Sequence, residues 1–377
     1  MYLDCAATAP MDPHVLEVCV RYLSQDFGNA SSRTHAEGAA ARKAVERARD
    51  QVAAVTGSNR GDVVFTSGAT ESNNLAILGL ADAGIKAGKR HIVSTGIEHR
   101  AVLEPLEELE RRGFEVTYVA PQKGGWVAAD AVAGAVRDDT LLVSVMHVNN
   151  ETGVVQPIDQ IAALLGDKPV YFHTDAAQGF AREVHCLRHE RIDLISLSAH
   201  KICGPKGVGA LIVKRRHARE RPPLEPLTFG GGQERGLRPG TLPVALIAAL
   251  GEAAERWSVN AAGRWQAGLK FRERLLEGLR PLQPCVNGDG DRSVPFLLNA
   301  SFPGLESDGI MQAWEGLVSV SSGAACSSQS YTCSHVLSAM GIAGERAASA
   351  IRFSWCHLTG MPDTAAMVAA LAEVKTA

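Results

Sequence analysis

The sequence lacks the features that mark membrane, secreted and nucleotide-binding proteins. No apolar run is long enough to span a membrane, and the N-terminal stretch "MYLDCAATAP" has no basic segment followed by an apolar one. The motif G-x-x-x-x-G-K-[ST] is also missing, and no G-x-G-x-x-G follows an expected strand. We therefore predict a cytoplasmic protein with no membrane partner and no nucleotide fingerprint.

An excess of charge of one sign is missing as well. The formal net charge is −3, so the chain has no overall field that would attract nucleic acid, and we expect no direct nucleic acid binding. A basic run, "KRRHARERPP" at 214–223, is a local exception. We interpret it as a solvated hairpin or loop, and docking of an acidic partner or of nucleic acid is the less favoured alternative.

The eight cysteines form no CxxC pair and no dense framework in a chain of 377 residues. Such irregular spacing indicates reduced thiols, most of which should be inert core residues. The sequence therefore predicts no metal site.

Between about residues 36 and 255, short β-rich runs alternate with amphipathic or alanine-rich runs. Apolar residues stand at helical spacing within 36–56, and Gly57 can end that helix. Strands are expected at 62–66, 91–95, 115–119, 141–148, 170–174, 193–198 and 209–213. This alternation predicts an α/β domain with a largely parallel sheet.

The pattern changes after a helical region at about 242–280, where short mixed elements replace the alternation. We predict a large α/β domain at 15–258 and a smaller α+β domain made of 1–14 and 259–377. In the smaller domain, residues 321–334, "SSGAACSSQSYTCS", are small and polar without apolar periodicity. This composition predicts a mobile loop that exposes its cysteines.

Polar residues follow several expected strands, and ligands of open parallel sheets bind beyond the carboxyl ends of the strands. These residues are the turn "TSGATESNN" at 66–74, His99, Asn150, Asp175, Gln178, Ser198, His200 and Lys201. The small residues of the turn would let an anion reach free backbone N–H groups at a helix start. A helix start capped by serine is an equally good interpretation of the turn alone.

Asp175 and Lys201 form the more specific combination. Alone, Asp175 could cap a turn and Lys201 could be a solvated surface residue. Together, an aspartate that keeps a pyridinium nitrogen protonated and a lysine that forms a Schiff base supply the protein's part of pyridoxal 5'-phosphate (PLP) chemistry. In such a site His99 could stack on the cofactor and relay protons, and Asn150 and Gln178 could bind its phenolic oxygen.

Seven motifs in order carry a resemblance over almost the full length, from "YLDCAAT" to "SAIRFSW". They are "TSGATESNN", "EHRAVL", "MHVNNETGVVQPI", "HTDAAQ", "SAHKICGPKGVGAL", "GGGQERGLRPGTLP" and "SSGAACSS". With them the chain resembles the cysteine desulfurases of the nitrogen-fixation and iron–sulfur-assembly type, within the class-V aminotransferases. The resemblance implies a fold-type I PLP-dependent transferase that is a homodimer and needs both subunits for each active site.

The resemblance also implies roles for individual residues. Lys201 matches the Schiff-base lysine, and His99 matches the ring-stacking histidine. The implied cofactor contacts are Ala69, Thr70, Asn150, Asp175, Gln178, Ser198, His200 and, across the dimer interface, Thr241. Arg352 and Asn150 match the residues that bind the substrate carboxylate.

Cys326 matches the cysteine that receives sulfur from the substrate. Cys5, Cys203 and Cys333 depart from the family pattern, and we interpret them as inert thiols. Cys333 lies in the same predicted loop as Cys326, which leaves open that it resolves or accepts a persulfide.

The implied reaction converts L-cysteine to L-alanine and leaves a persulfide on Cys326. Its sulfur would pass to an acceptor protein for a sulfur-containing cofactor, an iron–sulfur cluster or nucleic-acid modification. Two alternatives stay open at this point. One is another PLP enzyme, such as a selenocysteine lyase or an aminotransferase, and the other is a non-enzymatic scaffold that presents thiols to partners.

Overall fold

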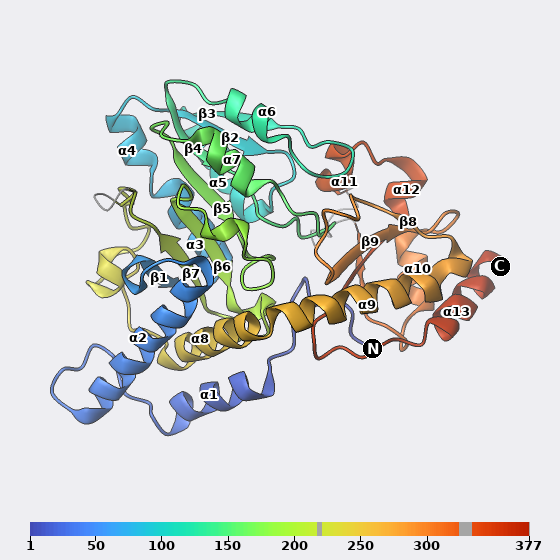
Figure 1. The fold of residues 1–377 in the computed structure, drawn as a ribbon, viewed down its shortest axis with the longest axis horizontal. Helices are drawn as coiled ribbons and strands as arrows, with labels where there is room; N and C mark the ends of the chain where they lie inside the picture. The colour runs from blue at the N-terminus through green and yellow to red at the C-terminus, as the bar shows by residue number, and fades with distance from the viewer. Residues whose placement is uncertain (217–220, 324–333, 377) are drawn as a thin grey trace.

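The computed structural model describes residues 1–216, 221–323 and 334–376, and a seven-stranded sheet forms its centre (Figure 1). The strand order is β1-β7-β6-β5-β4-β2-β3, and of these seven strands only β7 runs antiparallel to its neighbours. The strands are β1 (Val63–Thr66), β2 (His91–Thr95), β3 (Glu115–Val119), β4 (Thr140–Ser144), β5 (Tyr171–Asp175), β6 (Leu194–Ser198) and β7 (Gly209–Val213). The predicted α/β domain with a largely parallel sheet is confirmed.

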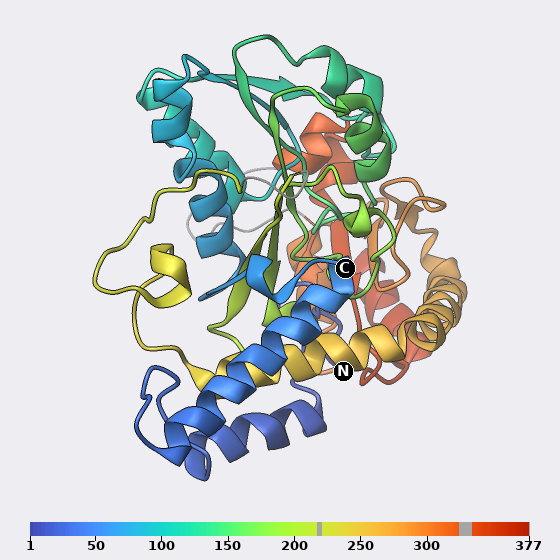
Figure 2. The ribbon, with the colours of Figure 1, turned by 60° about the vertical axis from the view of Figure 1, so that its left-hand side comes forward.

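Helices cover both faces of this sheet because successive strand residues point to opposite sides. Val63 and Phe65 of β1 pack into one core, and Val64 between them packs into the other. The first core holds α2 (Ala36–Thr56), α6 (Ala129–Gly134), α7 (Ile158–Leu165) and α8 (Val244–Val259), and the second holds α3 (Ala69–Leu78), α4 (Ala81–Lys86) and α5 (Arg100–Arg111). The outer helix α1 (Pro13–Ser24) packs on α8 (Figure 2).

Helix α2 has the bounds that the apolar spacing predicts. The ring of His35 caps its start by accepting a hydrogen bond from the backbone N–H of Gly38 (3.1 Å). Gly57 ends it in the left-handed conformation, with φ at 64°, which glycine adopts without a steric penalty. Buried small residues on one side of α2 allow close packing against α8.

All seven predicted strands are present, but the strand predicted at 141–148 ends at Ser144. Residues 145–148 leave the regular ladder because they begin a second set of contacts. Val148 forms an antiparallel bridge with Val155, and the N–H of Gln156 donates to the carbonyl of His147 (2.8 Å). An apolar run does not distinguish a strand from the approach to such a turn.

A second, antiparallel sheet lies beside the first, in the order β10-β11-β9-β8 (Figure 1). Its strands are β8 (Cys285–Val286), β9 (Leu297–Ser301), β10 (Ser321–Ser322) and β11 (Ala350–Ser354). The accompanying helices are α9 (Ala261–Leu279), α10 (Ser307–Ala313), α11 (His335–Ala339), α12 (Gly344–Ala348) and α13 (Thr364–Thr376). The predicted domain division near residue 258 coincides with the end of α8 and stays a prediction.

The N-terminal arm connects the two sheets. Asp4 bridges to Ser354 of β11, and the N–H of Ala9 donates to the carbonyl of His200 (2.9 Å) beyond β6. The arm therefore passes from the small sheet to the carboxyl end of the large one. In the described part of the chain, no helix combines the length and the apolar character needed to cross a membrane.

The packing of α8 on α2 gives a test of the fold. A Cβ at Gly251 would lie 2.7 Å from Ala48 Cα and 2.3 Å from Gln51 Oε1, so the helices must separate to admit it. We expect Gly251→Ala to lower the free energy of unfolding by about 1–3 kcal/mol, measured by denaturant titration. Gly263→Ala in α9 is the matched control, because its Cβ meets open space; it should stabilise by up to about 1 kcal/mol. Equal effects of both changes would contradict this account.

Candidate active site

A cavity of about 910 Å³ lies at the carboxyl ends of the large-sheet strands, between this sheet, the N-terminal arm and β11. Most of the residues singled out in the sequence line it: Ala69, Thr70, His99, Asn150, Asp175, Gln178, Ser198, His200, Lys201 and Arg352. Thr241 does not line this cavity and is exposed in the single chain. Cys326, Cys333 and most of the predicted loop lie outside the described residues.

The amine of Lys201 projects from a short 3₁₀ turn, Ala199–Lys201, directly after β6. Its Nζ donates to the carbonyls of Ala6 (2.5 Å) and Ala7 (2.8 Å) in the N-terminal arm. Burial, together with the positive charges of Arg352 and Arg182, lowers the pKa of Lys201 to about 8. Near neutral pH the neutral amine, which is the form that attacks a carbonyl carbon, is therefore far more populated than in an exposed lysine.

Asp175 ends β5, and its carboxylate is held in a fixed orientation. Oδ2 accepts from the side-chain amide of Asn73 (2.7 Å), and Oδ1 accepts from the backbone N–H of Ala177 (2.9 Å). Gln178 lies nearby and donates through Nε2 to the carbonyl of Ala6 (2.9 Å). The sequence analysis included Asn73 in a motif but gave it no role, because a polar residue in the first turns of a helix carries no sign that it contacts Asp175.

His99 caps the start of α5, where its Nδ1 accepts from the backbone N–H of Ala101 (3.1 Å). Burial lowers its pKa, and the charge of Lys201 acts in the same direction, whereas Asp175 opposes them. A neutral ring that accepts at Nδ1 carries its proton on Nε2. The helix cap therefore fixes both the orientation and the tautomer of this ring.

The turn from β1 into α3 forms an anion cradle. The N–H groups of Ala69 and Thr70 in the first turn of α3 have no intrahelical acceptor. Gly209 of β7 packs against this turn, since a Cβ there would lie 2.6 Å from Gly68 Cα. The side chains of Ser198 and His200 complete the cradle, and burial lowers the pKa of His200 to about 4, so its ring is neutral.

Arg352 extends from β11 into the cavity from the side of the small sheet. Its Nη2 pairs with Asp4 Oδ1 (2.9 Å), and its Nη1 donates to the backbone carbonyl of Asn150 (3.1 Å). Nε is buried without a partner in the described part of the chain. A guanidinium with an unused donor, facing the same cavity as Lys201, suits a ligand carboxylate.

These residues fit PLP. The cradle suits its phosphate, Asp175 suits its ring nitrogen, and Lys201 suits its aldehyde. Two buried oxygens at the cavity, Asn73 Oδ1 and Gln178 Oε1, also lack a partner among the described residues. Buried polar atoms are normally satisfied, so a polar ligand is expected beside them.

Two more cavity residues carry charge. Lys206, in the turn after Lys201, lines the cavity with an exposed side chain. Glu151 is buried, its pKa is raised to about 7 by burial, and it accepts a hydrogen bond from Ser334. Neither residue directly follows a strand, so its position in the sequence did not mark it as a cavity residue.

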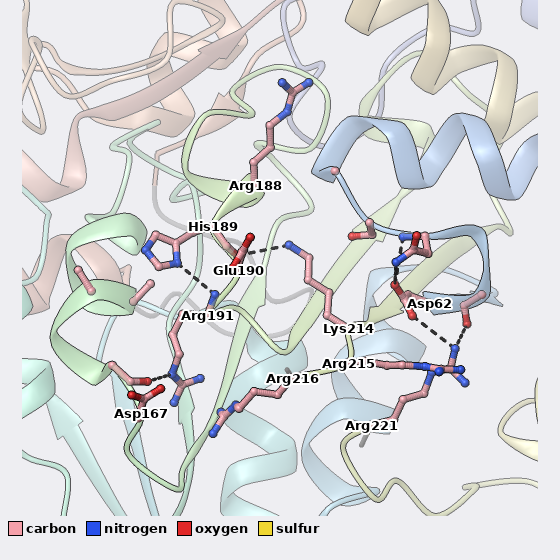
Figure 3. Close-up of a pocket in the computed structure, with 17 residues that line it drawn as sticks. Asp62, Asp167, Arg188, His189, Glu190, Arg191, Lys214, Arg215, Arg216 and Arg221 are labelled. Atoms are coloured by element: carbon pink, nitrogen blue, oxygen red, sulfur yellow. Dashed lines mark hydrogen bonds and ion pairs between the residues drawn. The ribbon is translucent and has the colours of Figure 1, made fainter. Parts of the chain in front are cut away.

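A second cavity, of about 860 Å³, lies near the amino ends of β1 and β6 and is lined by many basic residues (Figure 3). Most of its cations already have partners. Lys214 donates to the carbonyls of Leu187 (3.1 Å) and His189 (3.4 Å), and Arg191 and Arg216 both pair with Asp193. The prediction that the run at 214–223 is solvated is therefore wrong at Lys214, whose amine connects three chain segments by hydrogen bonds. Residues 217–220 lie outside the described residues.

Comparisons with known proteins agree with the arrangement of the 910 Å³ cavity. The model of the family described as aminotransferase class-V matches residues 1–364. Cysteine desulfurase IscS of Vibrio cholerae is 47% identical over 362 residues, which cover 95% of this chain and 88% of that protein. Among solved structures, DndA from Streptomyces lividans has 47% identity and a TM-score of 0.82, with 94% of this chain and 99% of that chain covered. A NIFS-like protein has 34% identity and a TM-score of 0.89, with 100% and 98% covered.

The chain belongs to the aminotransferase class-V family, whose fold-type I architecture matches the observed sheet. Within this family it is a PLP-dependent cysteine desulfurase that transfers sulfur. The resemblance stated from the sequence is confirmed, and neither another PLP enzyme nor a non-enzymatic scaffold is favoured.

The lowered pKa of Lys201 predicts how the apoenzyme takes up PLP. Because only the neutral amine attacks the aldehyde, the rate of covalent attachment should rise through a midpoint near the pKa of about 8. The measurement is the growth of visible absorbance, with borohydride trapping, over about pH 6–11. Arg352→Gln removes a nearby positive charge and should move the midpoint upward, whereas the remote Arg188→Gln should not. A midpoint near the ordinary lysine value of 10.5 would refute the assignment.

Proposed function

We propose that this enzyme takes sulfur from L-cysteine as a persulfide on Cys326 and passes it to an acceptor protein. The observation that carries the proposal is the convergence of Lys201, Asp175, His99 and Arg352 on one cavity. These four side chains come from four different parts of the chain. Arg352 has an unused donor, and the pKa values of Lys201 and His99 are lowered.

PLP, when bound, supplies an electron sink for the substrate Cα. Asp175 holds the ring nitrogen in its protonated form, and Asn73 and Ala177 keep the carboxylate oriented for that contact. The cradle at Ala69 and Thr70, with Ser198 and His200, holds the phosphate. His99 would stack on the bound ring, and Gln178 would hydrogen-bond its phenolic oxygen.

The substrate carboxylate binds Arg352 and Asn150. Arg352 is already paired with Asp4, so the carboxylate must displace or share that partner. Lys201, with a pKa lowered toward neutrality, then removes the Cα proton and later returns a proton to the product. His99, neutral and protonated on Nε2, donates a hydrogen bond within the same cavity.

The Cys326 thiolate attacks the substrate sulfur. A new S–S bond forms, the substrate Cβ–S bond breaks, and the electron pair of that bond stays on the carbon side. Protonation at Cβ and Cα then gives alanine, so one L-cysteine and one thiol yield one L-alanine and one persulfide. The persulfide sulfur leaves when an acceptor thiolate attacks it.

The nucleophile is tested by Cys326→Ala. Alanine formation from L-cysteine should fall by at least about 1000-fold, because nothing replaces the attacking thiolate, while the absorbance of bound PLP is kept. Cys285→Ala removes an exposed thiol outside the cavity and should leave the rate unchanged. Alanine formation at the full rate by Cys326→Ala would overturn the persulfide mechanism. In the active protein, labelled sulfur from L-cysteine then identifies the acceptor.

We also propose that the enzyme is a homodimer in the cytoplasm. Four apolar side chains form an exposed stripe along α1 and beyond it: Leu16 (48% exposed), Val20 (49%), Leu23 (63%) and Phe27 (73%). Contiguous exposed apolar surface is typical of protein interfaces. The segment that holds Thr241 also exposes Phe229 (86%), which supports contact of this segment with a partner subunit.

The described cysteines are all free thiols, as in a reducing compartment.

The dimer is tested by light scattering. The chain has a mass of 40.0 kDa, and the protein in solution should have twice that mass. Leu23→Glu combined with Phe27→Glu should yield monomers, because each change places charge in the stripe. Leu164→Glu changes a half-exposed residue on α7, far from α1, and should leave the dimer intact (Figure 1). A monomeric wild-type protein at micromolar concentration would exclude the proposal.

A further inference from the structure

Three buried thiols from distant parts of the sequence meet beneath Lys201. Cys5 belongs to the N-terminal arm, Cys203 follows Lys201 by two residues, and Cys356 follows β11. The thiols of Cys203 and Cys5 both lie close enough to interact with the thiol of Cys356. A group of cysteine sulfurs is the donor set that soft metal ions prefer.

A buried positive charge stands beside this group. Arg182 is 6% exposed, and no carboxylate of the described residues lies within ion-pair distance of it. Its Nη2 donates to the carbonyl of Lys201, and the guanidinium lies 5.2 Å from the ring centroid of Trp257. The three thiols are near enough to interact with its charge, and its Nε has no hydrogen-bond partner among the described atoms. Because a buried charge requires compensation, a net negative centre built on thiolates suits this position.

His357 adds a nitrogen donor. The donor atoms of Cys203, Cys356 and His357 all lie within 4.8 Å of one another. Nε2 of His357 lies 3.1 Å from Asp12 Oδ2, a carboxylate oxygen that accepts a hydrogen bond. Nδ1 of His357 is buried without a partner in the described structure. An Nε2 that donates to a carboxylate leaves the lone pair on Nδ1, as in histidines that ligate metals. Arg264 Nη2 lies 3.2 Å from the same Nε2 and could donate to it if Nε2 carried no proton. A metal ion bound at Nδ1 would keep the proton on Nε2 and so favour the hydrogen bond to Asp12.

The backbone at Cys203 is held in an unfavourable conformation. Its φ is 61°, in the left-handed region that a cysteine rarely adopts. Two contacts hold this segment: the N–H of Asp12 donates to the carbonyl of Cys203 (2.9 Å), and Arg182 donates to that of Lys201. Strain of this kind persists where the surrounding structure fixes the position of a side chain.

We propose that Cys203, Cys356 and His357, with Cys5 beside them, bind a thiophilic closed-shell cation, Zn²⁺ or Cu⁺. In a tetrahedral zinc site, bond lengths of about 2.0–2.3 Å place the donors roughly 3.5–3.8 Å apart. Donors within 4.8 Å therefore need only a small contraction. Thiolate and imidazole are also the ligands that copper(I) prefers. If Cys5 supplies a third thiolate, bound zinc has one negative charge, which the neighbouring Arg182 balances.

The His357 side of this group faces the surface. A surface pocket of about 640 Å³ is lined by His357, Leu358, Asp12 and two arginines. Once bound, the ion would tie the N-terminal arm, the Lys201 turn and the segment after β11 to one point. These are the segments that position Lys201 and Arg352 in the active site, so the ion would stabilise the site without touching substrate.

The test uses the full-length PLP-bound chain with Cys326→Ala and Cys333→Ala, which removes the two thiols of the predicted loop. This protein is equilibrated anaerobically with Zn²⁺ or with Cu⁺, freed of excess ion, and assayed for metal per chain and for melting temperature. Co²⁺ serves as the spectroscopic probe, because tetrahedral thiolate ligation gives visible ligand-field bands. We expect one ion per chain, an increased melting temperature and a Co²⁺ spectrum with sulfur ligation.

Variants in this background locate the ion. Cys203→Gly suits the left-handed backbone, and it should abolish binding, as should Cys356→Ala and His357→Gln. Asp12→Asn keeps the helix cap but weakens the contact to His357, so affinity should fall about 10–100-fold. Cys19→Ala is the buried control. Cys186→Ala controls for a second donor group, His147, Glu183 and Cys186, whose atoms already hydrogen-bond one another.

One ion, either Zn²⁺ or Cu⁺, that is lost in the first three variants and kept in both controls supports the proposal. Absence of stoichiometric metal, loss of metal in Cys186→Ala instead, or a disulfide between Cys203 and Cys356 in place of metal binding would each overturn it. If Cys356→Ala does not fold, Cys203→Gly and His357→Gln give the same decision.

Discussion

The contact between Lys201 and the N-terminal arm is the interaction on which the site depends. The amine lies between the carbonyls of Ala6 and Ala7, and the carbonyl of Lys201 accepts from the buried Arg182. The arm is in turn fixed to β11 through Asp4 and Ser354. The two sheets are therefore joined at the residue that must hold the cofactor, and a change in their relative position would move Lys201.

Burial then sets the charges around this contact. The rings of His99 and His200 are kept neutral, and the pKa of Lys201 is lowered, because each group lies away from water near other cations. Asp175 supplies the opposing negative charge and is held by Asn73. An apolar setting with one oriented carboxylate favours a protonated pyridine ring and a free amine in the same cavity.

Much of this arrangement follows from the sequence because it is local. Short stretches of sequence determine helix α2, the seven strands and the polar residues after them. The parallel sheet then brings the strand ends together. The contacts made by Asn73, Asp4 and Glu151 were missed because they join segments that no periodicity connects. The thiols of Cys5, Cys203 and Cys356 are the clearest example: their spacing along the chain resembles no metal motif, and only the fold makes them neighbours.

The ion pair between Asp4 and Arg352 has a consequence for selectivity. Every carboxylate that enters must compete with an anion already in place, so a simple carboxylic acid or a small anion gains little from the guanidinium alone. An amino acid can add a second attachment through its amine, and this offsets the displacement of Asp4. The ion pair therefore lowers the affinity for anions that have only one binding group, relative to amino acids.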